Sequence, residues 1–137
     1  MKKILIILLG LAVLGGIGGY FLWNKPHQNI AASQADVVFT ANQLLQAFET
    51  DEASANTKYL DEIIKVNGII KHIENNESGE ISVTLATDNE MSSVICNFDL
   101  TFKDFQKIKL GEEAVIKGLC SGYLMDVVLD RCVLSLE

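Results

Sequence analysis

Three cysteines, Cys96, Cys120 and Cys132, are the residues of this chain best suited to chemistry. In oxidising compartments outside the cytoplasm cysteines tend to pair, and an odd number leaves at least one thiol free or bonded to another molecule. The sequence has no Cys-x-x-Cys spacing, and its only histidines are His27 and His72. We therefore expect neither a zinc site nor another metal site.

The other reactive side chains do not form a catalytic pattern. The sequence contains no G-x-S-x-G, no glycine-rich phosphate loop and no His-x-x-x-His pair. His72 is a conceivable general base, but it fits an ordinary surface position on a strand. The acidic doublets Asp61-Glu62 and Glu112-Glu113 lie at the starts of predicted strands, where neighbouring side chains point to opposite faces. We predict a protein that is not an enzyme and holds no cofactor.

The elements that position these residues are mainly strands. Alternating apolar residues predict strands over 63–73, 80–86, 93–100, 114–119 and 126–136. Gly68 interrupts the first of them, and a glycine inside a strand often marks a bulge or bend. Two helices come first. Thr40 and Gln43 form a capping box for one, and Asp51 caps the other. A short helix is expected over 102–108.

This order, helices, three strands, a helix and two strands, is that of an oligonucleotide/oligosaccharide-binding (OB) barrel. We therefore predict a mainly β, α+β fold: a five-stranded OB barrel preceded by helices, with a helix between its third and fourth strands. A bent first strand suits such a barrel, because tight closure needs a corner. An open α+β sheet is the alternative.

The barrel also suggests how the cysteines pair. Its third and fifth strands are neighbours, so we predict a disulfide between Cys96 and Cys132 and a free thiol at Cys120. A hairpin turn over 121–125 would place Cys132 about five residues, or ~17 Å, beyond the residue opposite Cys120. A disulfide needs Cα atoms within about 7 Å. Alternatively, all three cysteines are buried small hydrophobes.

The N-terminus predicts the location. Residues 4–23 form a run of 20 residues without charge, and a helix of that length spans roughly 30 Å, the thickness of a bilayer core. Lys2 and Lys3 precede it and favour a cytoplasmic N-terminus. We predict a signal anchor or transmembrane helix over 1–23, a tether over 24–36 and a domain over 37–137 in the periplasm or at the cell surface. Secretion after signal cleavage is the alternative.

The charge of the predicted domain disfavours nucleic acid as a partner. Three of the 11 basic residues precede residue 26, whereas all 18 acidic residues follow residue 35, so the rest of the chain carries a net charge of −10. Nucleic-acid binders rely on clustered lysine and arginine, and Arg131 is the only arginine. The second and third strands contain one aromatic residue, Phe98, which the alternation points inward.

Several segments of the domain resemble a known family. They are 55–60 (ANTKYL), 64–70 (IKVNGII), 94–98 (VICNF), 110–122 (LGEEAVIKGLCSG) and 126–132 (DVVLDRC). Together, over about residues 38–136, they resemble the bacterial tRNA_anti-like proteins, small exported or membrane-tethered OB-fold domains of undefined activity. The resemblance implies the fold and does not imply RNA binding. Many such proteins carry a lipoprotein signal, whereas this chain has an uncharged span instead.

These observations predict a binding or scaffolding module at the bacterial envelope. Its ligand is unknown, and a protein, peptide or glycan is expected rather than nucleic acid. One alternative is a redox or covalent role for one of the three cysteines. A second alternative is nucleic-acid binding through the OB face.

Overall fold

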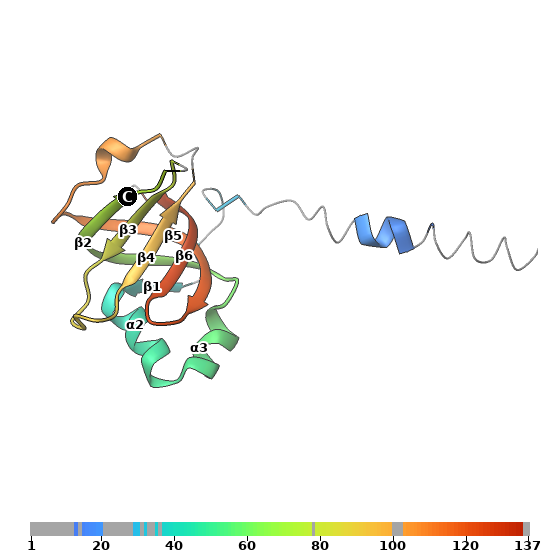
Figure 1. Ribbon diagram of the computed structural model, residues 1–137. Coiled ribbons are helices and arrows are strands. Elements are labelled where there is room, and N and C mark those ends of the chain that lie inside the picture. Colours follow the sequence, from blue (N-terminus) through green and yellow to red (C-terminus); the bar gives the residue numbers. More distant parts are fainter. Residues whose placement is uncertain are drawn as a thin grey trace, which may run out of the picture.

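The chain folds around a small β-barrel (Figure 1). The computed structural model describes residues 13, 15–20, 29, 30, 32, 35, 37–77, 79–99 and 103–135. The strands are β1 (Val37–Thr40), β2 (Ile63–Asn75), β3 (Ile81–Leu85), β4 (Val94–Phe98), β5 (Glu113–Tyr123) and β6 (Val127–Leu134). Two helices, α2 (Ala41–Thr50) and α3 (Glu52–Tyr59), and a 3-10 turn, η1 (Phe105–Lys107), complete the described elements.

The five strands β2 to β6 close into a barrel. Their order is β2-β3-β4-β6-β5, and β5 pairs back onto β2. The long strand β2 makes closure possible, because residues 63–69 pair with β5 and residues 70–75 pair with β3. The pair β4–β6 is parallel and the other pairs are antiparallel. This is the predicted OB barrel, and the alternative of an open sheet is wrong.

The core lies inside the barrel, on the faces that the period-2 alternation predicts. Each of β3 and β4 buries every second residue and half-exposes those between. Phe98 points inward as predicted and is 1% exposed. The fully buried strand residues are Ile64, Val66, Ile70, Val83, Leu85, Val94, Cys96, Phe98, Ile116, Cys120, Val127, Leu129 and Cys132.

Both helices begin where the sequence predicts, and they cover one end of the barrel (Figure 1). The apolar stripe of α2 inserts Leu44, Leu45 and Phe48 into the core. The Phe48 ring lies 6.2 Å from the ring of Tyr59 on α3 and 5.7 Å from that of Tyr123 on β5. Strand β1 was not predicted. It pairs in parallel with residues 64–67 of β2.

The capping box at the start of α2 gives a first testable prediction. The Thr40 hydroxyl accepts a hydrogen bond from the backbone N–H of Gln43 at 3.2 Å, and the Gln43 side chain accepts one from the N–H of Thr40 at 3.0 Å. We expect Thr40→Ala to lower the free energy of unfolding by about 1 kcal/mol. Urea titration followed by circular dichroism measures this. Thr50→Ala, at the exposed last residue of α2, is the control and should change stability by less than about 0.5 kcal/mol.

The helix predicted over 102–108 is wrong in extent, because the described part of this segment contains only η1. Residues 100–102 lie outside the described residues. Forming a first helical turn is costly unless apolar contacts repay it. Among the described side chains of this segment, Ile108 is buried, and the ion pair between Lys107 and Asp104 is exposed.

Gly68 serves a different purpose from the one predicted. The irregularity in β2 lies at Lys71, where the register with β3 shifts between Ile70 and His72. At Gly68 itself, a Cβ atom would lie 3.1 Å from the Cβ of Ala41 and 3.2 Å from that of Leu85. The glycine therefore lets the first turn of α2 approach β2 closely.

The predicted anchor over 1–23 and tether over 24–36 fall largely outside the described residues. Residues 13 and 15–20 are helical. Within the described part of the chain, no helix has the length and apolar character needed to cross a membrane.

Candidate binding site on the barrel face

A row of hydrogen-bonded polar side chains crosses the outer face of four strands. Alternation points Ser82 of β3, Asn97 of β4 and Asp130 of β6 outward. Ser82 and Asn97 are paired in register, and the Ser82 hydroxyl donates to Oδ1 of Asn97 at 2.8 Å. Nδ2 of Asn97 donates to Oδ1 of Asp130 at 2.8 Å, and the hydroxyl of Ser121 on β5 donates to Oδ2 of Asp130. We call Ser82, Asn97, Asp130 and Ser121 the polar ladder.

A β-bulge in β6 adds Arg131 beside the ladder. Lys117 pairs with Val133 and Leu119 pairs with Asp130, so β6 contains one residue more than β5 between these two pairs. Arg131 takes up the difference with a φ of 52°, in the left-handed region that residues other than glycine seldom adopt. Asp130 and Arg131 consequently both face the surface.

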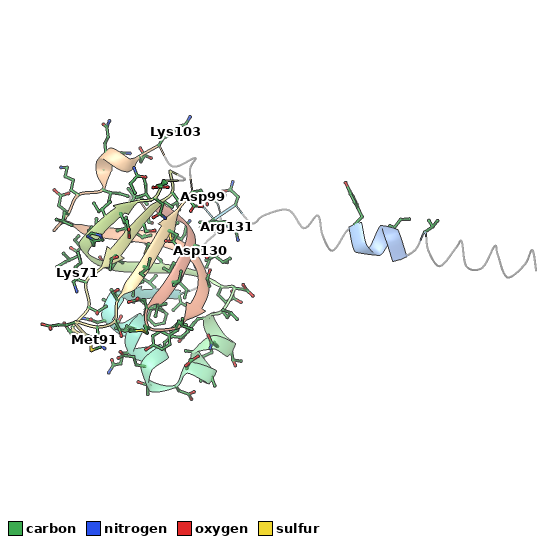
Figure 2. The ribbon with its side chains drawn as sticks, viewed as in Figure 1. Lys71, Met91, Asp99, Lys103, Asp130 and Arg131 are labelled. Atoms are coloured by element: carbon green, nitrogen blue, oxygen red, sulfur yellow. The ribbon has the colours of Figure 1, made fainter. Side chains whose placement is uncertain are left out.

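The ladder and Arg131 line a pocket of about 420 Å³. Figure 2 shows Asp99, Asp130 and Arg131 in one region of the barrel surface. Glu80 also lines the pocket, so three carboxylates accompany one guanidinium. Phe98 lines it from the core side and is 1% exposed.

The pocket is built for polar recognition. Internal hydrogen bonds hold both Asp130 oxygens and fix the Asn97 amide, yet each group keeps capacity for a further hydrogen bond. The guanidinium of Arg131, a half-buried residue, offers donors in a rigid fork. No histidine or cysteine lines the pocket among the described residues, and no described aromatic ring stands on its surface as a stacking platform. The arrangement suits hydroxyl, amide and charged groups of a ligand.

A wider hollow of about 500 Å³ lies between α2 and the β3–β4 loop. Its polar side chains already bind one another: Nδ2 of Asn89 donates to Oε1 of Glu49 at 2.7 Å, and the backbone N–H of Asp88 donates to Oδ1 of Asn42 at 2.7 Å. These bonds fasten the loop to the helix, which is a structural task.

The three cysteines are free thiols in this structure, and all are buried. Burial raises the pKa of Cys120, and it raises that of Cys132 well above its usual value with a further contribution from a hydrogen bond to Cys96. Cys96 and Cys132 thus lie close together, and their disulfide stays a prediction. Cys120 pairs with Leu129, only three residues before Cys132, because β5 extends to Tyr123; the predicted separation of five residues was wrong.

The other candidate residues do not come together. His72 is exposed on β2 opposite Thr84. The doublets Asp61-Glu62 and Glu112-Glu113 are exposed at the starts of β2 and β5. In the described part of the chain, no group of three or more histidine, cysteine or acidic residues is placed to hold a metal ion.

Sequence reasoning missed the polar ladder. Its signal was present, because Ser82, Asn97 and Asp130 occupy the outward positions of three strands that the OB order makes neighbours. The bulge at Arg131 had no such signal.

Comparison with known proteins supports the fold. A crystal structure of a "putative nucleic acid-binding lipoprotein" from Klebsiella pneumoniae superimposes with a TM-score of 0.61 at 22% sequence identity, over 82% of this chain and 100% of that one. No curated protein matches the sequence. The tRNA_anti-like family matches residues 1–134. The chain therefore belongs to the tRNA_anti-like family.

Proposed function

We propose that this protein is a non-catalytic binding module that presents the outer face of its OB barrel to a polar ligand. The polar ladder is the observation that carries the proposal. Four side chains from four strands are held by mutual hydrogen bonds at the border of a 420 Å³ pocket. Polar groups fixed in advance lose little entropy on binding, which favours a recognition role.

The ligand class follows from the charges of the pocket. Three carboxylates, on Glu80, Asp99 and Asp130, surround one arginine and would repel a phosphate backbone. Hydroxyl, amide and ammonium groups fit the same side chains, so we expect a glycan, peptide or protein surface. The Klebsiella protein carries the description "putative nucleic acid-binding lipoprotein", and single-stranded nucleic acid is therefore the competing candidate that an experiment must include.

The cysteines give less support to a thiol-dependent role toward partners. All three are buried, and burial raises the pKa of Cys120 and Cys132. A reactive cysteine needs exposure and a lowered pKa, so external thiol chemistry is disfavoured.

We further propose that the module acts at the bacterial envelope. The uncharged run over 4–23 is long enough for a membrane anchor, and the Klebsiella protein with the same fold is described as a lipoprotein. Fractionation of the full chain from a bacterial host should place it with the membranes.

The binding proposal is tested with the full chain in detergent on an array of oligosaccharides, short peptides and single-stranded RNA. For any oligosaccharide or peptide that binds, we expect Asp130→Asn to weaken binding tenfold or more, since a hydrogen bond to a charged group contributes about 1.5–3 kcal/mol. Glu90→Gln is the control, because it removes the same charge from an exposed position on the β3–β4 loop.

Two results would contradict the proposal. One is binding of RNA alone, with an affinity that falls steeply with salt and is unchanged by Asp130→Asn. The other is an equal loss of binding in the Asp130 and Glu90 variants, which would indicate a general effect of charge.

A further inference from the structure

The bulge in β6 determines which residue faces the core at the end of the barrel. Val127 and Leu129 point inward, so regular alternation would point residue 131 inward as well. The extra residue at the bulge leaves Arg131 at the surface and turns Cys132 inward, where it is 2% exposed. This left-handed conformation is strained for arginine, because residues with a Cβ atom seldom adopt it. The strained conformation of Arg131 accompanies the burial of the thiol at position 132.

That thiol meets a second one. Cys96 on β4 is fully buried and stands opposite Leu129 of β6 in a parallel pair. The Cys132 thiol donates to the carbonyl of Leu129, the residue paired with Cys96, at 3.3 Å, and the nearby Cys96 side chain helps to raise the pKa of Cys132. Two thiols from neighbouring strands therefore lie close together inside the core.

The strand on the other side of β6 leaves room for the sulfur. A Cβ atom at Gly118 of β5 would lie 2.5 Å from Sγ of Cys132, closer than any real contact of this kind. Only glycine at this position lets β5 pass over the thiol. The bulge, the glycine and the partner cysteine together make a specific place for Cys132.

We propose that Cys96 and Cys132 are a reversible redox pair whose disulfide fastens β4 to β6 directly beneath the polar ladder. The oxidant is a disulfide compound of low molecular weight or on a protein. A thiolate of the pair attacks one of its sulfurs and releases the first thiol; the second cysteine then attacks the mixed disulfide and releases the second thiol. The two protein thiols lose two protons and two electrons, and the oxidant becomes two thiols.

The cross-link acts on the candidate site because its two cysteines flank ladder residues. Cys96 precedes Asn97, and Cys132 follows Asp130 and Arg131. Joining β4 to β6 holds the hydrogen bond between Asn97 and Asp130 in place, so the oxidised barrel presents a more rigid face. A consequence for ligand affinity rests on the proposed function, whereas the cross-link itself does not.

The reaction is expected to be slow in the folded protein and faster at higher pH. Both thiols are buried, and burial keeps the pKa of Cys132 raised, so little attacking thiolate exists near neutral pH. Strand β6 must open for an oxidant to enter. Oxidation while the barrel closes during folding avoids this barrier.

The proposal is tested on the full chain in detergent. The chain is unfolded, which exposes every thiol, and is then refolded in a buffer of reduced and oxidised glutathione. Denaturation with N-ethylmaleimide then counts free thiols by mass. We expect three adducts on the reduced chain and one, on Cys120, after oxidation. The oxidised chain should melt roughly 10 °C higher, and the amide hydrogens of Asn97 and Asp130 should exchange more slowly.

Matched variants identify the pair. The Cys120→Ala variant should take up two adducts when reduced and none when oxidised, and its melting temperature should still rise on oxidation. Cys96→Ala and Cys132→Ala should keep two adducts and show no rise. Circular dichroism confirms that each variant folds. An oxidised chain that still takes up three adducts, or one whose disulfide contains Cys120, overturns the proposal. None of these measurements needs a ligand, so they stand apart from the test of binding.

Discussion

Replacing Phe48 with alanine is expected to lower the free energy of unfolding by about 3–5 kcal/mol. Phe48 is 1% exposed and reaches from α2 into the barrel end, against the rings of Tyr59 and Tyr123. Truncating Phe48 leaves a cavity between α2, α3 and the barrel that no neighbouring side chain can fill. It also removes the ring contacts with Tyr59 and Tyr123. The loss would be a large share of the stability of a small domain.

Urea titration of the full chain, monitored by far-UV circular dichroism, measures the effect. Leu124→Ala is the control, because Leu124 is 93% exposed in the β5–β6 turn and its truncation should change stability by less than about 0.5 kcal/mol. A Phe48→Ala variant within 1 kcal/mol of the original protein would show that α2 does not close this end of the barrel.

The result bears on what the sequence could predict of the fold. The strand alternation, the capping box at Thr40 and the Asp51 cap are local signals, and each produced a correct element. Strand β1 is short, and the contacts that fix it are with residues 64–67 of β2, far along the chain. The helix expected over 102–108 formed only in part. Its sequence signals were local, but the described part of this segment contains only η1, which lies at the opposite end of the barrel from α2 (Figure 1).

The candidate site divides in the same way. Knowing the OB order, one can place Ser82, Asn97 and Asp130 on one outer face from alternation alone. Alternation does not predict the position of the bulge, because the bulge depends on how β6 pairs with β5 at Gly118 and Leu119. The proximity of Cys96 to Cys132 was predicted from strand order, although regular alternation would have turned Cys132 outward. The sulfur reaches the core only because Arg131 adopts a positive φ.

Gly118 is therefore the second position at which a small change should have a large effect. We expect Gly118→Ala to lower the free energy of unfolding by about 2–3 kcal/mol, in the upper range for overpacking a core. The added Cβ would lie 2.5 Å from Sγ of Cys132, 3.1 Å from Cβ of Leu129 and 3.3 Å from the carbonyl oxygen of Asp130. The Leu129 Cβ and the Asp130 carbonyl oxygen are fixed to the backbone of β6, so they can move only if the strand moves.

A double-mutant cycle in the presence of reductant separates the sulfur from the backbone. Cys132→Ala removes the closest atom, so adding it to Gly118→Ala should recover part of the loss, with a coupling energy of at least about 1 kcal/mol. Gly111→Ala is an informative comparison: nothing lies within 4 Å of its added Cβ, but its φ of 81° makes alanine strained. Its cost should therefore be unaffected by Cys132→Ala. If the losses at Gly118 and Cys132 simply add, the glycine does not make room for the thiol, and the bulge has another cause.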